Sequence, residues 1–315
     1  MSEVIVVTSG KGGVGKTTTT ANIGAALALS GKKVVMIDTD IGLRNLDVIM
    51  GLENRIVYDL VDVVENRCVY SKALVRDKRF DGLFLLPAAQ SRDKSAVTTT
   101  QMKHLVHQMR ESFDYILIDC PAGIEQGFEN AVAAAEKAIV VAMPEVSSVR
   151  DADRIIGLLE KHDIKDIRLV INKVRYKMVE NGSMLSTEDM LDILAIDLLG
   201  VVPDDEDIII AANKGEFVSA EPKSKAGQAY RNIASRLNGE HVELLSLKKT
   251  FFEKTYYGKP QHAKVAVLAR QQRLVGYGQY ASPEQCYDAG DVVGCECVFE
   301  LCDGAYGQRG VDGER

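Results

Sequence analysis

A glycine- and lysine-rich stretch close to the start of the chain has the residue types and spacing that bind phosphate. Residues 10–17 read Gly-Lys-Gly-Gly-Val-Gly-Lys-Thr and fit the pattern G-x-x-x-x-G-K-[ST] between an apolar run and a helical pattern. Glycines at this spacing turn successive backbone N–H groups toward phosphate oxygens, and the start of the helix adds its positive end. Lys16 is expected to reach the β- and γ-phosphates of a nucleotide, and the Thr17 hydroxyl to bind Mg²⁺. The predicted nucleotide-binding residues of this loop are Gly10, Lys11, Gly12, Gly13, Val14, Gly15, Lys16, Thr17 and Thr18.

Carboxylates stand at the ends of two other apolar runs of strand length. Asp38 ends the second run and is followed by Asp40, and Asp119 closes a later one. Such acids can hold Mg²⁺ or orient an attacking water beside a phosphate-binding loop. For Asp38 and Asp40 the alternative is a helix N-cap or a solvated turn, because aspartate is common at both. The predicted metal-site residues are Thr17, Asp38 and Asp119.

Asn172 ends another apolar run, at a position suited to a side chain that recognises a nucleotide base. An amide both donates and accepts hydrogen bonds, which suits the N1/N6 edge of adenine. The alternative is an asparagine in a strand-end turn, where this residue is common. Asn172 is therefore the candidate for adenine recognition.

These residues need elements that bring distant parts of the chain together. Apolar runs alternate with helical patterns, and the runs are continuous, as in parallel strands that are buried on both faces. The alternation predicts an α/β fold with a doubly wound, mostly parallel sheet and helices on both faces, in which ligands bind at the carboxyl ends of the strands. The predicted strands are Val4–Thr8, Val34–Asp38, Leu83–Pro87, Tyr115–Asp119, Ala138–Ala142, Leu169–Asn172 and Leu199–Val202. The predicted helices are Thr17–Ser30, Gln101–Ser112, Val149–Lys161, Thr187–Leu194 and Lys225–Leu237.

The bulk composition argues against several classes of protein. The 315 residues are 46% hydrophobic and carry a net charge of −7 with a pI near 5.4, which argues against non-specific nucleic-acid binding as the main function. No apolar run approaches the ~18 residues of a spanning helix, and the N-terminus has no basic, cleavable leader, so we expect a cytoplasmic protein. The cysteines near the C-terminus lack the paired C-x-x-C spacing of a structural zinc site.

The chain changes character near residue 238, where we place the end of a nucleotide-binding domain that covers residues 1–238. Residues 239–257 contain a basic amphipathic segment suited to an anionic membrane surface, although the solvated end of the last helix is the alternative. Residues 258–315 have no sustained period, and we expect a poorly ordered tail, a fused extension or the product of a shifted reading frame. The predicted membrane-facing residues are Leu244, Leu247, Phe251 and Phe252, with Lys248, Lys249 and Lys254 beside them.

A second lysine, Lys11, gives the loop the form K-G-G-V-G-K-T-T, which resembles the deviant phosphate-binding loop of the MinD/ParA ATPases. Residues 3–238 are most similar to the division-site-selecting branch of that family, which implies a P-loop NTPase fold of the SIMIBI type. The segments that carry this similarity are 41–47 (IGLRNLD), 87–94 (PAAQSRDK), 119–125 (DCPAGIE) and 144–154 (PEVSSVRDADR).

The resemblance assigns roles to individual residues. It implies that Lys11 contacts ATP bound to a partner subunit, that Asp40 helps to place the hydrolytic water, and that Asp151 lies on the dimer face. It also implies that Asp119 supports Mg²⁺ and that Asn172 reads adenine. The predicted catalytic residues are then Lys11, Lys16 and Asp40.

The resemblance also implies the partners and the location of the protein. Members of the family hydrolyse ATP with Mg²⁺ as cofactor, form a homodimer when ATP binds, and attach to the inner face of the cell membrane through a C-terminal amphipathic helix. They recruit the division inhibitor MinC and are released when MinE stimulates hydrolysis.

Three alternative functions are those of a ParA-type DNA-partitioning ATPase, a bacterial tyrosine kinase and an iron–sulfur cluster carrier. The acidic pI disfavours the first, the wide spread of the C-terminal tyrosines the second, and the missing C-x-x-C pair the third.

Overall fold

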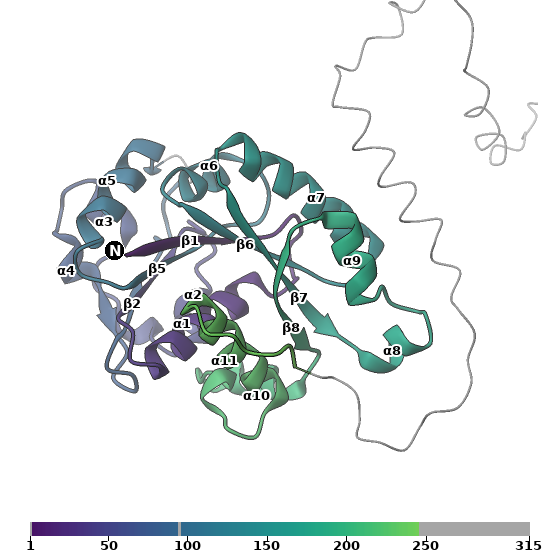
Figure 1. Cartoon of the computed structure of the whole chain (residues 1–315). Helices are drawn as coiled ribbons and strands as arrows, with labels where there is room; N and C mark the ends of the chain where they lie inside the picture. The colour runs from purple at the N-terminus through teal and green to yellow at the C-terminus, as the bar shows by residue number, and fades with distance from the viewer. Residues whose placement is uncertain (1, 94–95, 246–315) are drawn as a thin grey trace, which may run out of the picture. The chain divides into compact units, whose positions relative to one another are not determined.

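An eight-stranded sheet lies between two layers of helices in the computed structural model, which describes residues 2–93 and 96–245 (Figure 1). The strand order is β3-β4-β2-β5-β1-β6-β7-β8, and all neighbours are parallel except β3 and β4. Strands β2 to β5 lie on one side of β1, and strands β6 to β8 lie on the other. The predicted doubly wound, mostly parallel sheet is therefore confirmed. The strands are β1 (Glu3–Thr8), β2 (Val34–Asp38), β3 (Val75–Arg76), β4 (Leu83–Leu86), β5 (Tyr115–Asp119), β6 (Lys137–Ala142), β7 (Asp166–Val174) and β8 (Asp197–Pro203).

The strands are buried on both faces, which explains the continuous apolar runs in the sequence. Along β1, Val4 and Val6 pack into the core on one side of the sheet, whereas Ile5 and Val7 pack into the core on the other. Successive side chains of a strand point to opposite faces, so a strand that is covered on both sides needs apolar residues at consecutive positions. Each face of the sheet therefore carries its own layer of helices.

Figure 1 shows α6 and α7 on one side of the sheet and α1, α10 and α11 on the other. The layer with α6 and α7 consists of α3 (Leu60–Val64), α4 (Tyr70–Ala73), α5 (Thr99–Met109), α6 (Gln126–Ala133), α7 (Val146–Lys161) and α9 (Thr187–Leu194). The opposite layer consists of α1 (Lys16–Leu29), α2 (Leu46–Ile49), α10 (Glu206–Asn213), the 3₁₀ turn η3 (Val218–Ala220) and α11 (Lys225–Leu237). Two further short helices of the described residues are η1 (Glu53–Arg55) and α8 (Tyr176–Glu180).

All seven predicted strands and all five predicted helices are present, with small shifts at their ends. The largest shift at a helix start is in α7, which begins at Val146 rather than Val149. Seven further elements were not predicted from the sequence: the antiparallel edge strand β3, the helices α6 and α10, and the short helices α2, α3, α4 and α8. Apart from α6 and α10, which have eight residues each, these elements have two to five residues, too few for a hydrophobic period to appear.

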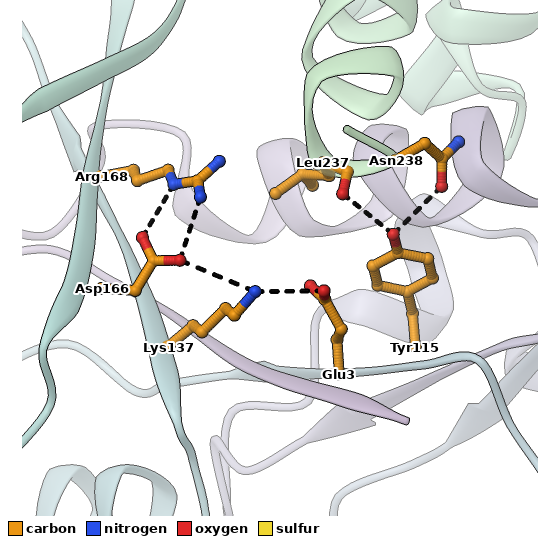
Figure 2. A network of polar contacts seen from close by, with 7 residues as sticks. All are labelled: Glu3, Tyr115, Lys137, Asp166, Arg168, Leu237 and Asn238. Atoms are coloured by element: carbon orange, nitrogen blue, oxygen red, sulfur yellow. Dashed lines mark hydrogen bonds and ion pairs between the residues drawn. The ribbon is translucent and has the colours of Figure 1, made fainter. Parts of the chain in front are cut away.

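The C-terminal end of α11 is hydrogen-bonded to the start of β5 (Figure 2). This contact lies at the amino ends of the parallel strands, whereas the phosphate-binding loop follows the carboxyl end of β1. The Tyr115 hydroxyl, at the start of β5, lies 3.1 Å from the Leu237 carbonyl and 3.0 Å from Oδ1 of Asn238, and donates to them. The Asn238 amide in turn donates to the Ser30 hydroxyl at the end of α1 (3.1 Å). The described chain therefore leaves α11 away from the loop. A row of alternating charges beside these residues joins the starts of β1, β6 and β7: Glu3, Lys137, Asp166 and Arg168.

The predicted C-terminal segments lie mostly outside the described residues. Of the segment 239–257, only residues 239–245 are described, and there Leu244 is 48% exposed. Leu247, Phe251, Phe252 and the three lysines beside them lie outside, as does the whole predicted tail 258–315. Among the described residues, no helix is both long enough and apolar enough to cross a membrane.

Candidate functional site

The predicted phosphate-binding loop connects β1 to α1 at the carboxyl edge of the sheet. Gly13 (φ 79°) and Gly15 (φ 93°) both have left-handed backbone conformations, which glycine adopts without a steric penalty. Helix α1 begins at Lys16, directly after Gly15, whose lack of a side chain leaves the first turn without a side-chain cap. The N–H groups of that turn therefore point toward the position where an anion would bind.

Two other elements hold the loop in place. A methyl group on Gly10 would overlap the backbone carbonyl of Asp151, so the start of the loop packs directly on α7. On the other side, Nδ2 of Asn172 donates to the Val14 carbonyl (2.8 Å), and Nζ of Lys173 donates to the Gly13 carbonyl (2.8 Å). The loop is thus held between α7 and β7.

Asp38 and Asp119 form a buried pair of carboxylates next to the loop. They end the neighbouring strands β2 and β5 and stand opposite each other in the pairing register. Burial and then the Asp119 charge raise the pKa of Asp38 to about 8. Burial likewise raises the pKa of Asp119, against the opposing effect of the Lys16 charge. A cation between these groups would remove the repulsion, so the two carboxylates suit a divalent metal.

Threonine hydroxyls surround Asp119. Thr20 donates to its Oδ1 (3.0 Å), and the Thr17 side chain is also hydrogen-bonded to this carboxylate. Thr39 donates to the Asp119 backbone carbonyl (2.7 Å), which ties the end of β2 to the end of β5. Neither Thr20 nor Thr39 was predicted from the sequence as a site residue. The spacing of Thr20 from Thr17, three residues along one helix, is a signal that could have identified the former.

Mg²⁺ fits this donor set. Magnesium is usually bound by one or two carboxylates together with phosphate oxygens and water, rather than by a cage of protein ligands. Thr17, Asp38 and Asp119 supply a hydroxyl and two carboxylates at one place. No cluster of three or more histidine, cysteine or acidic side chains suited to a metal occurs among the residues that the structure describes.

Asp40 and Lys11 lie at the exposed side of the site. Asp40 is half-buried, and its backbone N–H donates to Oδ1 of Asp38 (2.9 Å), so it directly follows the buried acid pair. Lys11 is exposed, with its Nζ 3.4 Å from the Ser147 hydroxyl in the first turn of α7. Its amine is therefore directed away from Asp119 and the other buried residues, toward the outer surface at the start of α7.

The structure corrects the predicted position of Asn172. This residue does not end its strand, because β7 continues to Val174 with an irregular register against β8. The residue is buried, its Nδ2 is engaged by the Val14 carbonyl, and its Oδ1 has no hydrogen-bond partner among the described residues. Its role in adenine recognition stays a prediction, with Oδ1 as the atom that remains to accept a hydrogen bond.

The predicted site residues therefore converge. The loop, the acid pair, Asp40 and Asn172 all lie at the carboxyl ends of parallel strands, and Asp151 packs against the start of the loop. A loop of N–H donors with a lysine beside a buried pair of acids is the arrangement that binds a nucleoside phosphate together with a divalent cation.

Comparison with known proteins agrees with this geometry. Residues 5–218 match the model of the CobQ/CobB/MinD/ParA nucleotide-binding domain. The chain is 59% identical to the septum site-determining protein MinD of Bacillus subtilis over 251 residues, which are 79% of this chain and 94% of that protein. It is 50% identical to the protein of the same name from Thermotoga maritima over 246 residues, 78% of this chain and 91% of the relative.

Solved structures show the same relationship. The MinD of the MinC:MinD cell division complex from Aquifex aeolicus superposes with a TM-score of 0.73 at 51% identity, over 78% of this chain and 98% of that one. The septum site-determining protein MinD from Pyrococcus horikoshii, solved with Mg-ADP, has a TM-score of 0.69 at 29% identity, over 76% of this chain and 96% of that one. The chain therefore belongs to the MinD/ParA family of P-loop nucleotide-binding proteins, in its MinD septum-site branch.

Proposed function

We propose that this chain is an ATP-dependent switch that places the division septum by dimerising on the membrane when ATP is bound and leaving it after hydrolysis. The observation that carries the proposal is the loop with its second lysine, Lys11, exposed beside α7 in a chain of the MinD branch. A lysine that contacts only the phosphates of its own subunit would be directed into the site. Lys16 is directed in this way, because its charge acts on the pKa of the buried Asp119 carboxylate.

Within one subunit, different residues bind the phosphates, the metal, the attacking water and the base of ATP. Lys16 and the loop N–H groups hold the phosphates, and Thr17 with Asp38 and Asp119 holds Mg²⁺. The metal, when bound, neutralises charge that builds up on the phosphate oxygens. Asp40 orients the attacking water from the exposed end of the acid pair. The buried Oδ1 of Asn172 accepts from the 6-amino group of adenine, a contact that favours ATP over a nucleotide without that amino group.

Dimer formation depends on Lys11 and on the surface around it. In the ATP state Lys11 leaves Ser147 and contacts the phosphates bound in the partner subunit, and Asp151 lies on the same face. Losing the γ-phosphate removes charge contacts that exist only between two ATP-bound subunits, so hydrolysis separates them.

The partners follow from the family. MinD of Aquifex aeolicus occurs in a complex with MinC, and we propose that the ATP dimer of this chain recruits MinC in the same way. MinE then stimulates hydrolysis and releases the dimer. The basic amphipathic segment 244–254 supplies the contact with an anionic membrane, and because one such segment is marginal, two per dimer bind together. We therefore propose that the protein is found in the cytoplasm and at the inner face of the cell membrane.

Sedimentation with anionic vesicles tests the proposal. Full-length protein is expected to pellet with vesicles in the presence of Mg-ATP and to stay in solution with Mg-ADP. Lys16→Ala, which weakens phosphate binding, and a truncation after Asn238, which removes the amphipathic segment, should both stay in solution. Light scattering should show a dimer with ATP that Lys11→Ala prevents. Full-length protein that stays in solution with ATP and vesicles would contradict the membrane switch.

A further inference from the structure

Lys173, which the sequence analysis did not single out, contacts the phosphate-binding loop from a neighbouring strand. Its Nζ donates to the Gly13 carbonyl (2.8 Å), directly beside the bond from Asn172 Nδ2 to the Val14 carbonyl (2.8 Å). Two consecutive residues of β7 thus bind two consecutive carbonyls of the loop. Among the described residues, no carboxylate forms an ion pair with Lys173, so its positive charge adds to the field at the loop.

An irregularity in β7 makes this double contact possible. In a regular strand, successive side chains point to opposite faces, and Asn172 and Lys173 could not both reach one loop. Here Lys173 has a φ of 57°, in the left-handed region, and the pairing with β8 shifts register between Ile171 and Val174. This conformation is unfavourable for a residue other than glycine, and such bulges are frequent next to functional sites. The irregular backbone turns the lysine toward the loop.

The contact determines which way the loop presents its polar groups. Each peptide unit has its carbonyl opposite its N–H group, so N–H groups can face a phosphate only if the neighbouring carbonyls face away from it. The carbonyls of Gly13 and Val14 accept from Lys173 and Asn172 of β7, so side chains outside the loop fix the orientation of both peptide groups. We propose that Lys173 is a positioning residue for nucleotide binding, which fixes the Gly13 carbonyl so that the loop N–H groups are preorganised for phosphate. This inference rests on the proposed ATP switch.

A comparison of three variants tests this role. Lys173→Gly removes the amine but accepts the left-handed backbone without strain, so the effect measured is that of the lost contact. Lys173→Arg keeps a cationic donor. Lys177→Ala removes an exposed lysine of α8 close by in the sequence and serves as the matched control.

Lys173→Gly is expected to raise the dissociation constants of Mg-ADP and Mg-ATP about tenfold, as expected for one lost charge-assisted hydrogen bond, measured by calorimetric titration. The dissociation constant should rise by the same factor for both nucleotides and for magnesium pyrophosphate, which has phosphates but no base. The KM for ATP should rise with kcat unchanged. Lys173→Arg should recover most of the affinity, and Lys177→Ala should bind like the parent.

Other outcomes would overturn the assignment. A Lys173→Gly variant that melts at a lower temperature without nucleotide, yet binds Mg-ADP as the parent does, would reduce Lys173 to a structural role. A loss confined to ATP and ADP, with pyrophosphate binding unchanged, would mean that Lys173 touches the base instead of the loop. If the parent protein bound no nucleotide in the same titration, the proposed ATP switch would fail, and the role of Lys173 with it.

Discussion

Replacing Gly10 with alanine tests whether close packing of the loop on α7 stabilises the protein. A Cβ on Gly10 would lie well under 3.0 Å from the carbonyl oxygen, the carbonyl carbon and the Cβ of Asp151. Most of these atoms belong to the backbone of a long helix, which cannot rotate away as a flexible side chain would. Either the loop or the helix must move by about 1 Å, and forcing an extra methyl group into a packed site costs about 1–3 kcal/mol. Because the obstacle is backbone, we expect a loss of about 2–3 kcal/mol in the free energy of unfolding.

Gly12→Ala is the matched control within the same loop. The nearest atom to a Cβ on Gly12 is the Ala122 Cβ at 4.0 Å, an ordinary contact, and Gly12 is not in the left-handed region. The same methyl group therefore fits there. Replacing a glycine in a compatible conformation restricts the unfolded chain and stabilises by about 0.4–1 kcal/mol. We expect Gly12→Ala to unfold at an equal or slightly higher urea concentration than the parent.

Urea unfolding of the nucleotide-free protein, followed by circular dichroism, measures both effects. Equal slopes of the unfolding free energy against urea would show that the variants differ in stability and not in compactness. Titration with Mg-ADP then shows whether the displaced loop of Gly10→Ala also binds nucleotide more weakly, as we expect. Coincident unfolding curves for Gly10→Ala and Gly12→Ala would refute the close packing of the loop against Asp151 and α7.

Three further substitutions probe other contacts. Tyr115→Phe should lower the free energy of unfolding by about 1 kcal/mol at pH 8, because the Leu237 carbonyl loses its donor. Burial raises the pKa of Tyr115 to about 12, so the stability that the hydroxyl contributes is complete below about pH 10 and is lost as the pH rises through 12. If urea unfolding showed that the parent and Tyr115→Phe lose equal stability at alkaline pH, this contribution of the hydroxyl would be contradicted. Thr20→Val removes the hydrogen bond to Asp119 (3.0 Å) and should raise severalfold the Mg²⁺ concentration for half-maximal ATP hydrolysis; an unchanged Mg²⁺ dependence would separate Thr20 from the metal site. Asn172→Ala should weaken ATP binding more than GTP binding in parallel titrations, and an unchanged ratio of the two dissociation constants would rule out Asn172 as the residue that reads adenine.

The parts of the fold and site that depend on local sequence could be predicted. The loop 10–17 was identifiable because its glycines and lysine occupy fixed positions within eight residues, and its conformation follows from them. The parallel strands were identifiable because burial on both faces requires consecutive apolar residues, as in Val4–Val7. Short elements such as β3 and α2 were missed, since they hold too few residues for a period to appear.

The arrangement of residues around the loop depends on strand order and on one irregular strand. Asp38 and Asp119 are far apart in the sequence, and only the pairing of β2 with β5 makes them a buried acid pair with raised pKa values. Regular alternation along β7 would have directed Asn172 and Lys173 to opposite faces, whereas the left-handed residue directs both to the loop. The sequence by itself thus determined which chemistry the loop performs. Only the tertiary structure decided which distant side chains hold that loop in place, because those contacts arise from pairing register and backbone irregularity that no local pattern encodes.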